Sequence, residues 1–295
     1  MRIAVLDIGG TSIKSALWDG TELGAVQETD TEASCGGEAV VRKAARILRT
    51  YGAFDAIGVS TAGQVNTDDG SIHYANQNIP GYTGVRLREI LEREFGVPAA
   101  VENDVNAAAL GELYFGAARG VRDFLCLTYG TGVGGAIVTD GKILHGNAWS
   151  GGSFGAMLIH PEQREKGVEL SGCYERCAST TALVQAACRI DKSLTDGRKI
   201  FAAFDRPEIR SVIDDWIGEI VFGLVTLIHV FDPPLVVLGG GILVQPYVAG
   251  EIRRRTMNMI EPNFRAVELR QAVLGNRAGL MGAVALHLMK NNLTE

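Results

Sequence analysis

The same short pattern occurs twice in the chain, and it restricts the fold more than any other feature. Each copy has an apolar run, a turn of glycine and threonine, a second apolar run and an Asp-Gly pair. A constant offset relates Gly9 to Gly130, and the same offset relates Asp19-Gly20 to Asp140-Gly141. Short continuous apolar runs indicate buried strands, and Asp-Gly pairs indicate two-residue hairpin turns. The sequence therefore predicts two α/β halves that each open with a β-meander.

Composition fits a globular protein of about two domains. The 295 residues are 46% hydrophobic and 21% charged, which supplies enough apolar material for two cores. A net charge of -6 and the absence of a Lys/Arg run argue against nucleic-acid binding. No apolar stretch approaches the ~20 residues that span a bilayer, and Asp7 comes too early for a signal peptide. Five cysteines without framework spacing predict reduced thiols and a cytoplasmic location.

The first glycine turn, Gly9-Gly10-Thr11, has the features of a phosphate site. Glycines let the backbone approach a phosphate closely, and consecutive N–H groups form an anion-binding nest. The Thr11 hydroxyl and Lys14 add side-chain donors, and Asp7 is placed to hold Mg²⁺ through water. An ordinary glycine turn is the alternative interpretation.

The second turn contains Thr131 and Gly132, within a stretch that matches the dinucleotide pattern G-x-G-x-x-G. That pattern requires a helix directly after it. Residues 136–141 instead predict a strand and a hairpin, so we reject an NAD-dependent oxidoreductase and predict a second phosphate turn. Farther on, Gly240 and Gly241 follow a buried strand and offer bare backbone for a flat purine.

A polar pair, Asn103-Asp104, lies where an apolar strand (98–101) meets a helix rich in Ala and Leu (105–115). Open α/β sheets bind ligands at such carboxyl ends of strands. A carboxylate fixed there can accept a proton from a substrate hydroxyl, which is general-base catalysis. The alternative is that an Asn or Asp only caps the helix. Further helices are predicted at 85–95, 180–190, 207–231 and 278–289, and the segment after Gly63, residues 64–80, is predicted to be a ligand loop.

Five segments in order resemble the ROK sugar kinases of the actin/hexokinase/Hsp70 superfold. They are Asp7-Ile8-Gly9-Gly10-Thr11, Glu102-Asn103-Asp104-Val105-Asn106, Thr128-Tyr129-Gly130-Thr131-Gly132-Val133-Gly134-Gly135, Leu238-Gly239-Gly240-Gly241-Ile242 and Ala278-Gly279-Leu280-Met281-Gly282-Ala283.

The resemblance implies a two-domain α/β fold of the actin-like ATPase (ribonuclease H-like) type with a central cleft. The expected domains are residues 1–115, joined by a C-terminal helix at 277–295, and residues 116–276. It also implies a homodimer that transfers a phosphoryl group from ATP, with Mg²⁺, to a sugar hydroxyl, commonly the 6-hydroxyl.

The resemblance also assigns roles to individual residues. Asp104 is the expected base, Asn103 and Asn78 bind sugar hydroxyls, and Gly63 lines the sugar pocket through its backbone. Ser153 and Glu175 occupy further sugar-binding positions of the family. The expected nucleotide-binding residues are Asp7, Gly9, Gly10, Thr11, Lys14, Thr131, Gly132, Gly240 and Gly241, with Asp7 also on Mg²⁺.

Two departures from the family pattern bear on metal and substrate. Many members carry Gly-Glu-x-Gly-His, whose Glu and His bind near the anomeric carbon, but Ser153 and Ala156 replace them here. Many also bind zinc through that His and a Cys-x-Cys-Gly-x-x-Gly-Cys run. Lys166 and Val168 replace the first two cysteines, and the pair Cys173 and Cys177 does not make a tetrahedral site, so no zinc is expected.

Small side chains at 153 and 156 open space at the anomeric position. We therefore predict 6-phosphorylation of a β-glucoside such as cellobiose, unless Phe154, His160 or a loop residue fills that space. The alternatives are a glucokinase, an N-acetylhexosamine kinase or a non-catalytic sugar-binding protein. Sugar-sensing regulators of this fold carry an added N-terminal helix-turn-helix, for which a first strand at residue 3 leaves no room.

Overall fold

The structure is a computed structural model that describes the backbone of residues 1–292 and the side chains through residue 289. The end of the predicted segment 277–295 lies outside the described residues. The chain divides into two compact units. The first contains Met1–Gly120, Ile143–Gly151 and the chain from Asn276 onward, and the second contains Val121–Lys142 and Gly152–Gly275. Residues 143–151 thus belong to the first unit, whereas the expected boundaries assign them to the second.

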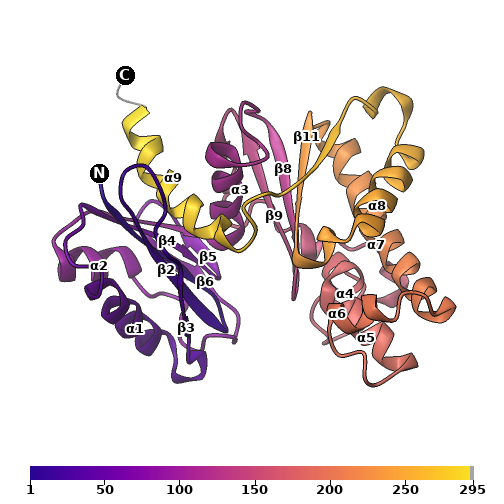
Figure 1. Ribbon diagram of the computed structural model, residues 1–295, viewed down its shortest axis with the longest axis horizontal. Helices are drawn as coiled ribbons and strands as arrows, with labels where there is room; N and C mark the ends of the chain where they lie inside the picture. Colours follow the sequence, from indigo (N-terminus) through magenta and orange to yellow (C-terminus); the bar gives the residue numbers. More distant parts are fainter. Residues whose placement is uncertain (293–295) are drawn as a thin grey trace. The chain divides into compact units, whose positions relative to one another are not determined.

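The first unit is built on a five-stranded sheet of order β3-β2-β1-β4-β7, whose strands appear in indigo and purple in Figure 1. β1 and β2 are antiparallel, whereas β1, β4 and β7 are parallel. A separate hairpin joins β5 and β6. The elements are Ile3–Ile8 (β1), Ser12–Trp18 (β2), Gln27–Asp30 (β3), Gly37–Arg49 (α1), Ala56–Thr61 (β4), Gln64–Asn66 (β5), Ser71–Tyr74 (β6), Leu87–Phe95 (α2), Ala99–Asn103 (β7), Asp104–Phe115 (α3) and Ala278–Asn292 (α9).

The central strand β4 shows how helices cover both faces of this sheet. Ile57 and Val59 are buried in the apolar core that contains side chains of α1 and α2. Gly58, which points to the opposite face, lies against the backbone of Ala283 in α9. Any side chain at residue 58 would collide with that backbone, so glycine lets α9 pack directly on the sheet.

The second unit repeats this plan with a sheet of order β10-β9-β8-β11-β12. Its core is packed around the long helix α7, and it includes Trp216, Ile220 and Leu224. The elements are Phe124–Tyr129 (β8), Val133–Thr139 (β9), Lys142–Ile143 (β10), Tyr174–Ala178 (α4), Thr180–Ile190 (α5), Gly197–Ala202 (α6), Pro207–Phe231 (α7), Leu235–Gly239 (β11), Pro246–Met259 (α8) and Glu268–Gln271 (β12).

The predicted repeat of the opening motif is confirmed by the strand pairing. In the second unit β8 pairs antiparallel with β9 and parallel with β11, just as β1 pairs with β2 and β4. Strand β9 follows the second glycine turn directly, which confirms the rejection of the dinucleotide fingerprint. Among residues 1–292, no helix has the length and apolar character needed to cross a membrane.

The two Asp-Gly pairs differ, and one prediction was wrong. Asp140 and Gly141 both have positive φ (50° and 72°) and form the predicted two-residue turn between β9 and β10. Asp19-Gly20 lies in a longer loop, and β3 begins only at Gln27. The Asp19 carboxylate accepts the N–H groups of Thr21 and Glu22, and this local capping competes with a tight turn.

The segment 64–80 is also more ordered than predicted. It contains the hairpin β5–β6 in place of a continuous loop. The irregular stretch that carries Asn76 and Asn78 begins only after Tyr74, and both asparagines are exposed. The part of this segment available as a ligand loop is therefore shorter than expected.

Candidate active site

The residue pair Asn103-Asp104 occupies the junction of β7 and α3, and its two members have different roles. Asn103 is the helix cap, since its Oδ1 accepts the backbone N–H groups of Val105 and Asn106 at 3.0 and 3.2 Å. Its Nδ2 donates to the Gly63 carbonyl at 2.8 Å and to Asp104 Oδ1 at 2.9 Å. The capping interpretation therefore applies to Asn103, and a sugar contact by Asn103 stays a prediction.

Asp104 begins α3 with its carboxylate held on one side only. Oδ1 accepts the Val105 N–H at 2.9 Å as well as Asn103 Nδ2. Within residues 1–292, Oδ2 accepts no hydrogen bond. Burial and then the negative charge of Asp7 raise the pKa of Asp104 to about 6, against the hydrogen bonds from Val105 and Asn103, which lower it. The arrangement gives an oriented carboxylate whose outer oxygen can take a proton near neutral pH.

Gly63 and Asn78 lie in the same unit as Asp104. Gly63 has φ +92°, and an added Cβ would lie 2.9 Å from the Tyr74 carbonyl, so only glycine fits. Its carbonyl is the one that fixes Asn103. Asn78 is exposed, and its Cβ is 3.8 Å from the position that a Cβ would take at Gly10. The predicted sugar-binding Asn78 is thus brought beside the first glycine turn.

The first glycine turn connects β1 and β2 and is fixed by a residue that the sequence analysis did not identify. Thr31 donates its hydroxyl to the Gly9 carbonyl at 2.7 Å and its N–H to the Thr11 carbonyl at 2.9 Å. Both carbonyls are therefore engaged with Thr31. Gly10 and Thr11 are exposed, which leaves this turn accessible to a phosphate.

Asp7 and Lys14 are cross-strand partners in β1 and β2. Lys14 Nζ is 3.9 Å from Asp7 Oδ2, and the Ser60 hydroxyl donates to Asp7 Oδ1 at 2.7 Å. Burial raises the pKa of Asp7, while Ser60 and Lys14 oppose that rise. Magnesium is commonly held by one or two carboxylates, waters and substrate phosphates. Asp7 and Asp104 are two carboxylates whose negative charges interact, and Lys14 pairs with Asp7, so the residues present fit such a cation.

In the second unit, the turn between β8 and β9 is fixed by α4 and α5. Thr181 donates its hydroxyl to the Thr131 carbonyl at 2.7 Å. Glu175 accepts the Val133 N–H at 3.0 Å, and its carboxylate lies so close to Gly132 that any side chain there would collide with it. Glu175 is therefore positioned against the glycine turn, and its predicted sugar contact stays a prediction.

The predicted adenosine residues follow β11. Gly240 has φ +131°, and a Cβ there would overlap the Tyr129 carbonyl, so the site requires glycine. Gly241 begins a 3₁₀ turn (Gly241–Val244) and is exposed. A Cβ added at Gly241 would meet no atom of the described residues within 4 Å beyond its chain neighbours. Its backbone is therefore open to a ligand.

The segment around Ser153 and Ala156 bears on how much space is open near the predicted sugar-binding positions of this unit. Ser153 and Ala156 are exposed. Phe154 is 5% exposed and belongs to the apolar core, with its ring centroid 6.0 Å from that of Phe231. His160 is bound to Glu162 and Glu219. Phe154 therefore points into the core, and His160 is held by two carboxylates.

Two further residues of the first unit, Glu102 and His145, were not assigned a role from the sequence. Glu102 is 2% exposed, and its Oε2 lies 2.8 Å from His145 Nε2. Its Oε1 accepts the Asn103 N–H at 2.8 Å. A glutamate in an otherwise apolar strand was the available signal, because a buried carboxylate needs partners.

The comparisons with known proteins agree with this geometry. A family model described as "ROK family" matches residues 3–290. A β-glucoside kinase of Listeria innocua is 34% identical over 304 residues and covers 100% of both chains.

Two solved structures extend the similarity to three dimensions. The ROK hexokinase of Thermus thermophilus is 34% identical, with a TM-score of 0.82 and coverage of 99% of this chain and 100% of that chain. A ROK family glucokinase of Streptomyces griseus in complex with glucose and AMPPNP is 28% identical, with a TM-score of 0.82 and coverage of 97% and 99%. These similarities confirm the expected actin-like ATPase fold.

Proposed function

This chain belongs to the ROK family and is an ATP-dependent sugar kinase, and from that premise we propose that its acceptor is the 6-hydroxyl of the glucose unit of a β-glucoside. The observation that carries the transfer to a hydroxyl is the carboxylate of Asp104, held through Oδ1 and open at Oδ2, in the same unit as the first glycine turn and Lys14.

In the proposed reaction Asp104 Oδ2 accepts the proton of the sugar hydroxyl. The hydroxyl oxygen forms a bond to the γ-phosphorus of ATP, and the bond to the β-phosphate oxygen breaks, which leaves ADP. Lys14 and the backbone N–H groups of Gly10 and Thr11 stabilise the phosphate charge. A Mg²⁺ ion held through Asp7 would supply further charge neutralisation when bound.

We propose the remaining ligand contacts as well. Gly9, Thr131, Gly132, Gly240 and Gly241 contact the nucleotide through the backbone. On the sugar side, Asn78, Asn103, Gly63, Ser153 and Glu175 position the ring. The support for these roles is the exposure of Gly10 and Gly241, the requirement for glycine at Gly240 and the resemblance of the segments to the family motifs.

Acceptance of a β-glucoside is supported by the segment 152–156. Ser153 and Ala156 are small and exposed, and Phe154 is buried in the core, so these side chains offer little obstruction to an anomeric substituent. The name of the Listeria innocua relative agrees with this substrate. A glucokinase is the second candidate, because the Streptomyces griseus relative binds glucose. An N-acetylhexosamine kinase or a non-catalytic sugar-binding protein would also fit the same fold.

The test is to measure kcat/KM for cellobiose, glucose and N-acetylglucosamine on one preparation, with ADP release as the assay. We expect cellobiose to be used at least as efficiently as glucose. A tenfold preference for glucose, or about 1.4 kcal/mol in transition-state free energy, would refute the β-glucoside acceptor while leaving the kinase intact. No ADP release with any of a panel of monosaccharides and disaccharides would favour a sugar-binding protein.

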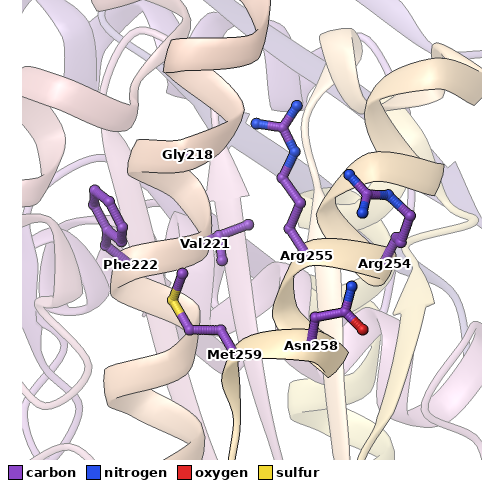
Figure 2. Close-up of a pocket in the computed structure, with 7 residues that line it drawn as sticks. All are labelled: Gly218, Val221, Phe222, Arg254, Arg255, Asn258 and Met259. Atoms are coloured by element: carbon purple, nitrogen blue, oxygen red, sulfur yellow. The ribbon is translucent and has the colours of Figure 1, made fainter.

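We also propose that the enzyme is a cytoplasmic homodimer. All five cysteines are free, as expected for a reducing compartment. The surface pocket in Figure 2, between α7 and α8, is bordered by Phe222 and Met259, which are 44% and 50% exposed. Exposed apolar side chains that gather around a pocket suit a protein contact. Sedimentation of the native protein and of Phe222→Glu tests this, and a native monomer at all concentrations would refute the dimer.

A further inference from the structure

Three potential metal ligands from three separate elements meet in the second unit, outside the glycine turns. They are His160, just before a 3₁₀ turn (Pro161–Gln163), Cys177 of α4 and Glu219 of α7. Their ligand atoms all lie within 4.8 Å of one another, and His160 Nε2 is 2.7 Å from Glu219 Oε2. An imidazole nitrogen, a thiol sulfur and a carboxylate oxygen at this separation can share one cation after small side-chain adjustments.

The elements that carry these ligands are held together independently of any ion. The buried Tyr174 hydroxyl of α4 donates to the Ile220 carbonyl of α7 at 2.7 Å, next to Glu219. The backbone N–H of His160 donates to the Gly172 carbonyl at 2.9 Å, directly before α4. The three ligands are therefore positioned by packing and backbone hydrogen bonds, which reduces the cost of ordering a site.

A fourth residue, Glu162, contacts the other ring nitrogen of His160. Glu162 Oε1 is 3.0 Å from His160 Nδ1, while Nε2 of the same ring is 2.7 Å from Glu219 Oε2. Metal-binding histidines almost always donate their second ring N–H to a carboxylate or carbonyl, which fixes the tautomer. Glu162 provides that partner, and it leaves Nε2 as the nitrogen available for a cation.

We propose that His160, Cys177 and Glu219 bind one divalent cation of the zinc class, with Glu162 orienting His160 and a fourth position open to water. The mixture of nitrogen, sulfur and oxygen ligands suits Zn²⁺ and excludes Mg²⁺ and Ca²⁺ as preferred ions, since those take oxygen ligands. Burial and Glu219 raise the pKa of Cys177 to about 11, so the thiol carries its proton near neutral pH. Binding of the cation to the thiolate therefore releases this proton to solvent.

This proposal departs from the expectation of no zinc, and it uses different ligands from the family run. The sequence places Ala156, Lys166 and Val168 at positions where many relatives have His or Cys. Cys177 is visible in the sequence, but His160 and Glu219 are distant from it and join it only in the fold. A bound cation would fasten the irregular segment before α4 to the long helix α7.

The alternative is an ion-pair cluster, in which protonated His160 binds Glu162 and Glu219 and Cys177 takes no part. Contact with both carboxylates raises the pKa of His160, which fits that alternative. The two arrangements differ in one respect that can be measured. Only a metal site depends on the sulfur of Cys177.

The first experiment is equilibrium dialysis of the chelator-treated full chain against Zn²⁺, with elemental analysis. We expect one zinc per chain in the native protein. Cys177→Ser and Glu219→Gln should each weaken binding by at least tenfold, and Glu162→Gln by about 10–100-fold as an outer partner. Cys35→Ser is the matched control, because Cys35 is exposed and remote in sequence, and it should leave binding unchanged. No stoichiometric zinc, or equal binding in Cys177→Ser, would overturn the proposal.

The second experiment does not depend on whether the Cys177 variant folds. Co²⁺ added to Cys35→Ser protein should give a near-ultraviolet thiolate-to-cobalt band, and that band should be lost in the additional variant Glu219→Gln. Zn²⁺ should also raise the Tm of the native protein in a saturable way, and this effect should be absent in Glu219→Gln. Absence of the band would overturn the proposal whatever the fate of the other variants.

Discussion

Glu102 Oε2 lies 2.8 Å from His145 Nε2, across 43 residues of sequence. The contact fixes the segment 143–151 to β7, the strand that ends at Asn103 directly before Asp104. Glu102 also accepts the Asn103 N–H through its other oxygen. One buried carboxylate therefore connects the helix cap behind the proposed base to a segment that enters the first unit from the middle of the chain.

His145→Ala should lower both stability and turnover. It leaves the buried Glu102 oxygen without its partner, which costs about 1–3 kcal/mol. We expect a lower free energy of unfolding in urea, together with a reduced kcat, because Asn103 and Asp104 lose part of their support. His73→Ala is the control, since His73 is exposed on β6. Equal effects of the two variants would show that the Glu102 contact has no special role.

Asp104→Asn should reduce kcat by roughly 10²–10⁴-fold, as expected for loss of a general base. The amide is nearly isosteric, so binding of ATP and sugar, measured by calorimetry, should persist. Asp68→Asn is the control, because Asp68 is exposed and remote in sequence. Retention of more than about a third of native turnover, with chemistry still rate-limiting, would rule out Asp104 as the base.

The pH profile should show the raised pKa of Asp104. The base acts only when deprotonated, so kcat/KM should be low below pH 6 and should rise as pH passes through about 6. The negative charge of Asp7 contributes to this raised pKa, so Asp7→Asn should move the acid limb of the residual activity to lower pH. An acid limb near pH 4 in the native enzyme would contradict the assignment.

The sequence was sufficient for the repeated architecture because that depends on local patterns. Apolar runs, glycine turns and helical spacing indicated both sheets, and α5 and α7 have the predicted bounds. Helix α8 was not predicted, since its buried positions Val248, Ile252 and Thr256 are interrupted by Gly250 and a run of arginines. The Asp19-Gly20 turn was mispredicted because the same dipeptide serves a two-residue turn or a longer capped loop.

The residues of the candidate site also fall into two groups, those that local sequence patterns predict and those that only the fold brings together. The glycine turns and the Asn103-Asp104 pair could be found from the sequence, because each lies at a strand end and uses neighbouring residues. The division of that pair into cap and proposed base needed the hydrogen bonds of Asn103. Local patterns do not predict pairs of residues that are distant in sequence. Two such pairs are Glu102 with His145 and His160 with Glu219.

Gly279→Ala should weaken the binding of ATP. Gly279 lies in the first turn of α9, and an added Cβ would be 2.7 Å from Asp7 Oδ1 and 2.8 Å from the Ser60 hydroxyl. Such contacts are shorter than real Cβ contacts, so either Asp7 moves or α9 shifts on the sheet. We expect a destabilisation of about 1–3 kcal/mol from overpacking and a higher KM for ATP as Asp7 and Lys14 are displaced.

The matched control is Gly250→Ala in α8, where an added Cβ meets no atom of the described residues within 4 Å beyond its chain neighbours and the backbone of its own helix. Replacing an unobstructed helical glycine should stabilise the protein by roughly 0.5–1 kcal/mol and leave KM for ATP unchanged. The two substitutions add the same methyl group to a helix, so opposite signs in their unfolding free energies would isolate the contact with Asp7. If Gly279→Ala were also stabilising and kinetically silent, the close packing of α9 against the Asp7 carboxylate would not contribute to nucleotide binding.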